Sequence, residues 1–379
     1  WWVAYRLAAL EPDVVGISVT CWNARAAYEL VRVLGAALPD ARVVLGGPEA
    51  GPIAEDVLRA HPHAHAVVRG EGEVTFAELL AAYADAAPAA PAHEVAGVTA
   101  RTPDGAVRAA PDREPVADLD TLPSPYLTGV MPPLDGATYL ETYRGCPHAC
   151  AYCFEGHGST RVRSHSDERV RAEIGLVASA QGVRSFSFID PVFNLTDSRL
   201  RTLADTLAPH AVRGVRLHTV EVDVERIGPE QAALLARAGV ASVETGPQTT
   251  GAAALAACGR PFDPDAFQAG VEALRAEGIA TECDLIFGLP GDTPGDMVAS
   301  MEWALGVHPW RIQCSTLRVL PGTVLWDRAP ELGLAFDPEP PHEVVTTAEA
   351  GFADLRRIEL MGAVLADEHA AALEGGVRA

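Results

Sequence analysis

Hydrophobic and polar positions in the first 85 residues alternate between two kinds of segment. Short apolar runs rich in β-branched residues predict buried strands at 13–20, 41–50 and 64–73. The intervening segments have helical spacing and good helix-forming residues, at 24–38, 53–61 and 74–86. Strands and helices that alternate at this period are typical of an open parallel α/β sheet.

A second alternation begins near residue 137. The predicted strands lie at 138–142, 184–190, 215–222, 241–246, 279–287 and 311–319. The predicted helices lie at 166–181, 197–209, 229–239, 263–278 and 294–306. Six strand–helix units are too few to close an eight-stranded barrel, so we expect a partial one. Residues 86–136 are interpreted as a linker with a possible hairpin at Asp104-Gly105, and residues 331–379 as a helical tail.

Composition narrows the class of protein. The chain has 379 residues, 48% of them hydrophobic, which is enough for two packed domains. A net charge of −22 argues against a nucleic-acid groove or an anionic membrane surface. No apolar run approaches the ~20 residues of a membrane span, and no signal-peptide pattern is present. Because the first residue is Trp1, we expect the sequence to begin partway into a longer protein.

The seven cysteines do not form the pattern of a disulfide framework, so we expect a reducing cytoplasm. Cys21, Cys258, Cys283 and Cys314 are solitary and embedded in apolar runs, where we interpret them as packing residues. The other three lie within eight residues, in the stretch "CPHACAYC" (146–153), with the spacing C-x3-C-x2-C.

Three thiols are an odd number for a cysteine site. A structural zinc ion takes four ligands, and so does an ordinary electron-transfer iron–sulfur cluster. Either His148, His157 or a remote cysteine supplies a fourth ligand, or one coordination position stays open. The thiols follow the first strand of the second alternation, and ligands of α/β folds bind beyond the carboxyl ends of strands.

These features together resemble the radical S-adenosylmethionine (SAM) superfamily. The cysteine motif is followed, in the expected order, by "FSFIDPVFN" (186–194), "VETGPQTT" (243–250), "DLIFGLPGDT" (284–293) and "LRVLPGT" (317–323). The resemblance covers residues 137–330 and implies a (β/α)6 partial barrel. It also implies that Cys146, Cys150 and Cys153 hold a [4Fe-4S] cluster. The fourth iron of that cluster would bind SAM, and reduction would yield a 5′-deoxyadenosyl radical.

The same resemblance implies further SAM contacts near the strand ends. They are Tyr152, Asp190, Glu221, Glu244, Gln248 and Gly288. Three of them have an alternative interpretation from the residues alone. Asp190 is equally well placed as a turn residue, and Glu221 and Glu244 as polar residues that line the barrel.

Residues 1–85 resemble the Rossmann-like cobalamin-binding domain found in one branch of that superfamily, here without its first strand. The resemblance rests on "PDVVGISVT", "VVLGGPEA" and "VVRGEGEVTFAELL", with "LDTLPSPYL" leading into the core. It implies cobalamin contacts from Ser18, Thr20, Trp22, Gly46, Gly47, Arg69 and Glu71. The alternatives are a tight turn at Gly46-Gly47 and a solvated loop around Arg69. The Asp-x-His-x-x-Gly motif of cobalamin domains would fall beside a strand expected before Trp1, and many members of this branch lack it. Because neither "TCWNAR" nor "GGPEAG" contains a histidine, we expect cobalamin without a protein nitrogen ligand beneath the cobalt.

Taken together, the resemblance implies a cobalamin-dependent radical SAM methyltransferase. Methylcobalamin would donate a methyl group to an unactivated carbon or phosphorus centre of a small molecule or natural-product intermediate. The expected partners are that substrate and an electron donor such as flavodoxin or ferredoxin, with no nucleic acid and no membrane. Two alternatives stay open: a radical SAM enzyme of other chemistry, such as a rearrangement, and a non-catalytic iron–sulfur electron-transfer protein.

Overall fold

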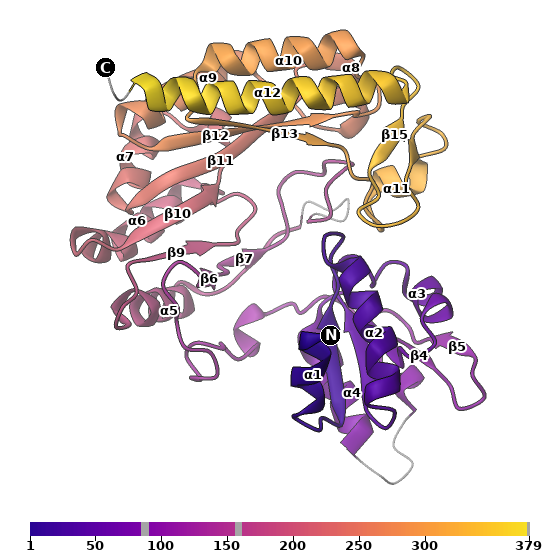
Figure 1. Cartoon of the computed structure of the whole chain (residues 1–379). Helices are drawn as coiled ribbons and strands as arrows, with labels where there is room; N and C mark the ends of the chain where they lie inside the picture. Colours follow the sequence, from indigo (N-terminus) through magenta and orange to yellow (C-terminus); the bar gives the residue numbers. More distant parts are fainter. Residues whose placement is uncertain (85–90, 156–160, 377–379) are drawn as a thin grey trace. The chain divides into compact units, whose positions relative to one another are not determined.

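The computed structural model describes residues 1–84, 91–155 and 161–376 (Figure 1). It divides the chain into two compact units. Unit 1 comprises Trp1–Ala117 and two later segments, Arg318–Asp327 and Asp337–Glu343. Unit 2 comprises Asp118–Leu317, Arg328–Phe336 and Val344–Ala379. The two units are described separately.

Unit 1 contains a five-stranded sheet in the order β1-β2-β3-β4-β5. The strands are β1 (Val14–Ser18), β2 (Arg42–Gly46), β3 (Ala66–Val68), β4 (Val98–Arg101) and β5 (Val107–Ala109). The helices are α1 (Trp2–Ala8), α2 (Ala24–Ala37), α3 (Ala54–Ala60) and α4 (Gly72–Ala84), with a short 3-10 turn η1 (Ala92–Glu94). The first three strands are parallel, as their apolar runs predict.

The first three strands are continuous apolar runs because both faces of the sheet are buried. Leu34 of α2, Leu45 of β2 and Leu58 of α3 are at most 1% exposed and belong to one core on the side of α1, α2 and α3. Val44 and Leu79 belong to a second core on the side of α4. Since each fully buried leucine contributes about 1.5–3 kcal/mol, covering both faces of the sheet is the main source of its stability.

The sheet continues beyond the boundary expected at residue 85. β4 pairs with β3 in an antiparallel manner, and β5 pairs with β4 through the hairpin that contains Asp104-Gly105. Part of the expected linker is therefore an edge of the sheet. The segments Arg318–Asp327 and Asp337–Glu343 also belong to this unit, although they follow the barrel strands in sequence.

Unit 2 contains a six-stranded sheet in the order β13-β12-β11-β10-β9-β6, with every neighbouring pair parallel. Its strands are β6 (Tyr139–Leu140), β9 (Ser185–Phe188), β10 (Arg216–Glu221), β11 (Val240–Gln248), β12 (Ala280–Phe287) and β13 (Arg311–Thr316). All six fall within or next to the predicted ranges, and the sheet stays open as a partial barrel.

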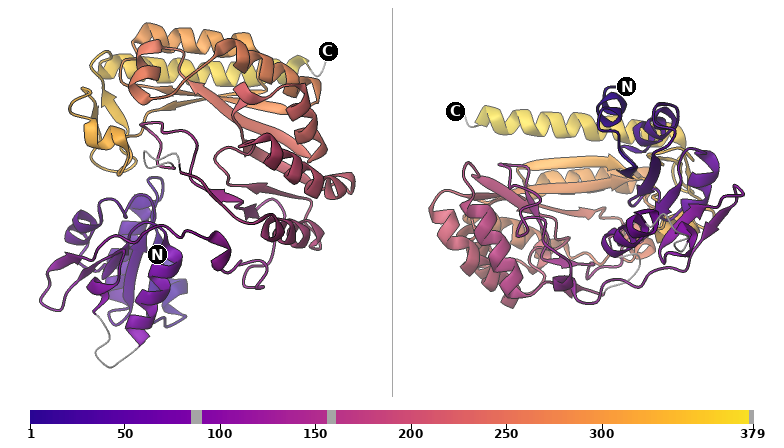
Figure 2. Two further views of the ribbon diagram at one scale, coloured as in Figure 1. Left: turned by 180° about the vertical axis from the view of Figure 1, so that it is seen from behind. Right: turned by 90° about the horizontal axis from the view of Figure 1, so that it is seen from below.

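Helices follow the strands of unit 2 on its outer side (Figure 2). They are α5 (Asp167–Ser179), α6 (Asp197–Val212), α7 (Pro229–Arg237), α8 (Ala252–Cys258), α9 (Pro264–Ala276) and α10 (Pro294–Val307). Local signals fix several of their starts. Ser166 and Thr196 accept hydrogen bonds from the backbone N–H groups three residues later, and Thr293 with Asp296 forms a capping box.

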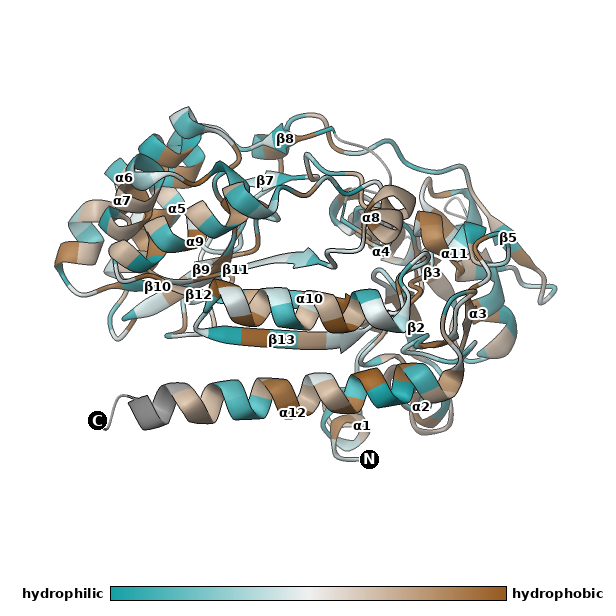
Figure 3. Ribbon diagram, turned by 90° about the horizontal axis from the view of Figure 1, so that it is seen from above, coloured by the Kyte–Doolittle hydropathy of each residue, from teal (hydrophilic) through white to brown (hydrophobic). Residues whose placement is uncertain are grey.

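The region after the barrel is only partly the helical tail that the sequence predicts. It contains α11 (Val324–Arg328), β14 (Ala335–Phe336) and β15 (Val344–Thr346) before the long α12 (Phe352–Gly376). Along α12 hydrophilic and hydrophobic residues alternate, as Figure 3 shows. Neither α12 nor any other helix in the described part of the chain is long and apolar enough to cross a membrane.

Two further strands, β7 (Tyr143–Arg144) and β8 (Arg163–Ser164), form a small antiparallel pair outside the main sheet. Short 3-10 turns complete the unit at η2 (Leu119–Thr121) and η3 (Val224–Arg226). The β7–β8 pair matters for the site because the three clustered cysteines lie in the loop between its strands.

The Gly46-Gly47 turn yields a first testable prediction. Gly47 has φ +99°, and a Cβ there would lie 2.5 Å from the Val19 carbonyl oxygen. Gly105 has a similar φ of +84° with nothing within 4 Å. We therefore expect Gly47→Ala to destabilise unit 1 by about 1–3 kcal/mol more than Gly105→Ala. Hydrogen exchange of peptides from β1 and β2 measures the difference; equal exchange in both variants would contradict the prediction.

Candidate functional site

A cavity of about 210 Å³ lies in unit 2 at the carboxyl ends of β10, β11 and β12. All three clustered cysteines line it, and Cys146 and Cys150 are buried. The other lining residues carry mostly charged or polar groups, among them His148, Tyr152, Glu155, Glu221, Asp223, Glu244, Gln248, Arg260 and Asp284. The parallel sheet therefore brings together residues that are more than a hundred positions apart.

The cysteine loop is closed at its base by the β7–β8 pair. Tyr143 pairs with Ser164, and the backbone N–H of His165 donates to the Thr142 carbonyl at 3.0 Å. Gly145 has φ +93°, and a Cβ there would lie 2.2 Å from the Arg161 carbonyl oxygen. The residue just before Cys146 must therefore be a glycine if the two sides of the loop are to approach this closely.

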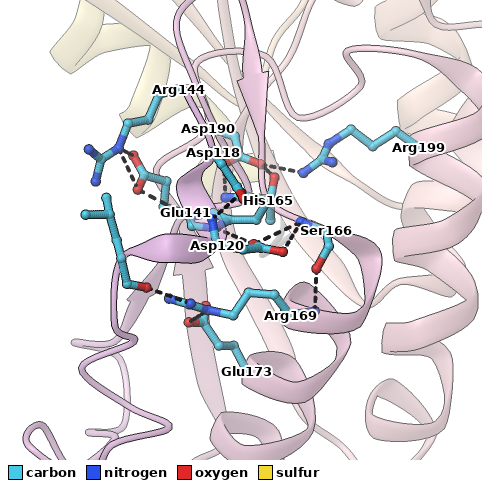
Figure 4. A network of polar contacts seen from close by, with 12 residues as sticks. Asp118, Asp120, Glu141, Arg144, His165, Ser166, Arg169, Glu173, Asp190 and Arg199 are labelled. Carbon is cyan, nitrogen blue, oxygen red and sulfur yellow. Dashed lines mark hydrogen bonds and ion pairs between the residues drawn. The ribbon is translucent and has the colours of Figure 1, made fainter. Parts of the chain in front are cut away.

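Side chains reinforce the same base (Figure 4). The buried His165 ring lies between two carboxylates, with Nδ1 3.1 Å from Asp120 and Nε2 3.9 Å from Glu141. Glu141 also pairs with Arg144, two residues before Cys146, at 3.0 Å. Hydrogen bonds that the His165 ring donates to Glu141 and Asp120 raise the pKa of His165, which favours its charged form within this network.

Burial favours the protonated thiols of Cys146 and Cys153 when no metal is bound. It raises the pKa of Cys146, and it raises that of Cys153 to about 11, with the neighbouring thiols adding to both shifts. Metal ligation requires thiolates, so binding of iron must release these protons. Within the described residues no three His, Cys, Asp or Glu side chains converge on one ion. An iron–sulfur cluster does not require three side chains to converge on one ion, because each cysteine ligates a different iron.

Arg260 is a site residue that the sequence analysis did not identify. Its Nη1 lies 3.6 Å from the Cys150 sulfur, and its Nη2 donates to the Gly246 carbonyl at 2.5 Å. It follows α8, whose last residue, Cys258, accepts a hydrogen bond from the Ala151 N–H. In the sequence, "CGRPF" looks like any loop with an arginine, so no local signal distinguishes it. A buried guanidinium beside these sulfurs would stabilise their ionised forms.

Three carboxylates face the cysteines from neighbouring strands. Glu221 of β10 and Glu244 of β11 are register partners, and Asp284 lies on β12. Burial, with the charges of Glu244 and Glu155, raises the pKa of Glu221 to about 7. Burial and Glu244 also raise the pKa of Asp284 well above its usual range, and Gln313 donates to that carboxyl group at 3.3 Å. The sequence analysis identified the two glutamates but missed Asp284.

The other predicted SAM contacts divide into two groups. Tyr152 and Gln248 line the cavity, and Gln248 adopts φ +67° where the β11–β12 register shifts. Asp190 and Gly288 do not line it. The Asp190 carboxylate accepts hydrogen bonds from the Thr142 N–H and hydroxyl, and Arg199 lies 3.6 Å away. The assignments to SAM stay predictions for all of these residues.

The two histidines of the zinc alternative have different positions. His148 lines the cavity, and its Nε2 lies 3.4 Å from an Asp223 carboxylate oxygen. His157 lies outside the described residues.

In unit 1 the predicted cobalamin contacts also separate into two groups. Ser18 and Gly46 are register partners at the carboxyl ends of β1 and β2, with Gly47 and Thr20 directly after them. Trp22 follows and is 73% exposed.

The other two predicted contacts hold the sheet edge to the segment after β5. Arg69 pairs with Asp112 at 2.8 Å and donates to the Ala110 carbonyl at 2.6 Å. Glu71 accepts from the Val116 N–H at 2.8 Å. All seven assignments to cobalamin stay predictions.

Comparison with known proteins agrees with this division of the chain. Residues 140–304 match the model of the radical SAM superfamily, and residues 3–80 match that of the B12 binding domain. The chain is 27% identical over 341 residues to an uncharacterized methyltransferase of Pyrococcus horikoshii, covering 86% of this chain and 71% of that protein. It is 35% identical over 178 residues to the cobalamin-dependent radical SAM methyltransferase TokK of Streptomyces tokunonensis, covering 44% of this chain and 25% of TokK.

Among solved structures, the chain is similar to the radical SAM methyltransferase TsrM of Kitasatospora setae, with tryptophan and a SAM analogue bound. The TM-score is 0.71 at 21% identity, over 94% of this chain and 74% of that one. This likeness shows the fold.

Fold and site therefore define an α/β protein that joins a Rossmann-like unit to a parallel partial barrel with a cysteine- and carboxylate-lined cavity. The chain combines a radical SAM domain with a B12-binding domain. The cofactors of this combination are a [4Fe-4S] cluster, SAM and cobalamin. The cavity fits the first two because it offers three thiols, a guanidinium and several hydrogen-bond acceptors.

The buried carboxylates yield a prediction for the cofactor-free protein. Below about pH 4, Asp284 is protonated in both the folded and the unfolded state, so it has no effect. At higher pH the unfolded chain loses this proton while the folded protein, with its raised pKa, keeps it. The free energy of unfolding therefore falls with rising pH. We expect Asp284→Asn to raise the unfolding midpoint of unit 2 at pH 8 but not at pH 4.

The matched control is Glu277→Gln, which removes an exposed carboxylate from the same unit. Its midpoint should follow the wild type at both pH values. Thermal unfolding of the apo protein measures the wild type and the two variants. An Asp284→Asn midpoint that matches the wild type at pH 8 would contradict the raised pKa of Asp284 in the folded protein.

Proposed function

We propose that this protein is a cobalamin-dependent radical SAM methyltransferase that acts on an unactivated carbon or phosphorus centre of a small molecule. The observation that carries the proposal is the convergence of three cysteines, Arg260 and three carboxylates from β10, β11 and β12 on one cavity of unit 2. The match of residues 3–80 to the B12 binding domain supports the cobalamin part.

Cys146, Cys150 and Cys153 are the residues that would hold the cluster. A reduced cluster held there would supply the electron for reductive cleavage of SAM. The cavity's own groups have separate tasks. Arg260 lies against the Cys150 sulfur and would balance the negative charge of a cluster ligated there. Its remaining N–H groups can donate to the carboxylate of a bound ligand.

The carboxylates serve the opposite end of the ligand. Glu221 and Glu244 are hydrogen-bond acceptors suited to ribose hydroxyl groups, and Tyr152 and Gln248 add polar contacts along the wall. Cys146 and Cys150 in the same cavity are buried, and exclusion of water there would protect a reactive radical from side reactions. Asp190 acts here as a positioning residue, because it holds the Thr142 end of the cysteine loop.

In unit 1 we assign cobalamin to the edge formed by Ser18, Thr20, Gly46 and Gly47, with Trp22 beside it. When bound, cobalamin supplies a cobalt centre that carries the methyl group. Neither "TCWNAR" nor "GGPEAG" contains a histidine, so these loops offer no nitrogen ligand to the cobalt. An electron donor such as flavodoxin or ferredoxin completes the system. A radical SAM enzyme that does not use methylcobalamin is the second candidate, favoured if no corrin is bound.

The cluster assignment is tested by a triple substitution. Replacing Cys146, Cys150 and Cys153 by Ala removes every thiol of the loop, so we expect loss of the iron–sulfur absorbance and of all SAM cleavage. Cys258→Ala is the control. That thiol is buried near Cys150, but its contact with the loop is a backbone one, so cluster and cleavage should survive. A full cluster in the triple variant would refute the assignment.

The cobalamin assignment is tested at Gly46. A Cβ there would meet Val68 atoms at 3.7–3.8 Å, an ordinary contact, so the fold tolerates a small side chain. We expect the wild type to bind hydroxocobalamin with a base-off spectrum. Gly46→Ala should bind it several-fold more weakly, and Gly46→Leu should not retain it. SAM cleavage should persist in both, because it depends on unit 2. A wild type that retains no corrin would overturn the methyltransferase proposal in favour of the second candidate.

A further inference from the structure

A buried pair of side chains joins two distant parts of unit 1. Glu49 follows the Gly46-Gly47 turn directly, whereas His342 comes from the segment after the barrel, 293 residues later. His342 Nε2 lies 2.9 Å from Glu49 Oε1, and both side chains are only about 2% exposed. Both residues belong to unit 1, so this contact is internal to one compact body.

The partners of the ring define its protonation state. His342 Nδ1 lies 3.2 Å from the Asp337 carbonyl oxygen, which can only accept a hydrogen bond. Nε2 faces a carboxylate oxygen, which is also an acceptor unless it is protonated. The arrangement therefore favours an imidazolium with both nitrogens donating. Burial lowers the pKa of His342, and the interactions with Glu49 and Asp337 outweigh it and raise the pKa overall.

Backbone hydrogen bonds connect Glu49 to the predicted cobalamin edge. The Glu49 N–H donates to the Val19 carbonyl at 3.1 Å, and the Val19 N–H donates to the Gly46 carbonyl at 2.7 Å. Val19 is also the residue whose backbone fills the space where Gly47 lacks a Cβ. The position of Glu49 thus determines how the Gly46-Gly47 turn sits against the end of β1.

His342, the other residue of the pair, is held by residues of the segment Arg318–Asp327. The Val319 N–H donates to the His342 carbonyl at 2.9 Å, and the Trp326 ring meets the His342 ring edge-on at 5.1 Å between centroids. Arg318 begins the other post-barrel segment of unit 1, Arg318–Asp327, and its guanidinium lies over the Trp22 ring at 5.9 Å. The two post-barrel segments therefore contact both loops: His342 contacts Glu49 after β2, and Arg318 contacts Trp22 after β1.

We infer that His342 is a positioning residue for the cobalamin edge of unit 1, and that it acts by holding Glu49 and, through Glu49, the Gly46-Gly47 turn. This inference rests on the proposed cobalamin site. His342 is not a cobalt ligand, because both of its ring nitrogens are engaged. Glu49 Oε2 has no hydrogen-bond partner within the described residues. Loss of His342 would leave the whole carboxylate buried without a partner, which is strongly unfavourable.

The test is titration of full-length, anaerobically reconstituted protein with hydroxocobalamin. Because each single substitution leaves a buried group without its ionic partner, we expect His342→Gln and Glu49→Gln to bind about tenfold more weakly or worse. The double variant replaces the ion pair by two amides, which can hydrogen-bond to each other. It should recover most of the lost affinity, giving a large coupling in the double-mutant cycle.

His63→Gln is the matched control. A second cavity, beside α2 and α3, is lined by both His63 and His342, but the His63 side chain is exposed. This control should bind like the wild type. The visible spectrum of bound cobalamin should be the same in wild type and His342→Gln, because the imidazole does not reach the cobalt. A changed cobalt spectrum in that variant would overturn the positioning role in favour of axial ligation.

The outcomes separate this inference from the proposed function. If the wild type binds cobalamin and His342→Gln binds equally well, the inference fails and the proposed function stands. If the wild type binds no cobalamin, the proposed function fails first. If the single variants do not fold, the double variant decides: restored folding and binding support the pair, and a double variant as weak as the singles overturns it. Cluster absorbance and SAM cleavage report whether unit 2 is intact in each.

Discussion

The parallel direction of every strand in the main sheet of unit 2 is the constraint on which the site depends. Because β9 to β13 run the same way, their carboxyl ends share one edge, and polar residues there must face one another. Glu221 and Glu244 are brought together by register alone. The β7–β8 pair then fixes the cysteine loop beside this edge. Chemistry that needs thiols, a cation and carboxylates in one place follows from that geometry.

This convergence is electrostatically unfavourable without cofactors. Thiols and carboxylates crowd together in one cavity, and desolvation together with the neighbouring ionisable groups raises the pKa of Cys146, Cys153 and Glu221. Arg260 is the cation that lies against a sulfur of the group. A cavity of this kind is stabilised by what it binds, because iron displaces the thiol protons and a ligand supplies hydrogen-bond donors to the carboxylates. Site function and apo-protein stability are therefore opposed.

Unit 1 has a comparable dependence on a distant part of the chain. Its sheet is local in sequence, but the Gly46-Gly47 turn is held by Glu49, and Glu49 is held by His342. The segment that supplies His342 follows the barrel, so the two units are interleaved in sequence although each is compact. A boundary drawn from the strand–helix alternation misses this, because the segment has no strong pattern of its own.

The sequence by itself determined the parallel strands of the two main sheets, most helices and the cysteine motif, because apolar periodicity and capping residues act between near neighbours. It also identified Glu221 and Glu244, since they end predicted strands. It did not predict the short strands β7, β8, β14 and β15. Only the tertiary structure revealed Asp284, Arg260 and the Glu49–His342 pair. It also showed Asp190 bound to Thr142 and Arg69 bound to Asp112. Such roles depend on contacts across tens to hundreds of residues, and a carboxylate or guanidinium looks the same in sequence whether solvent or a buried partner surrounds it.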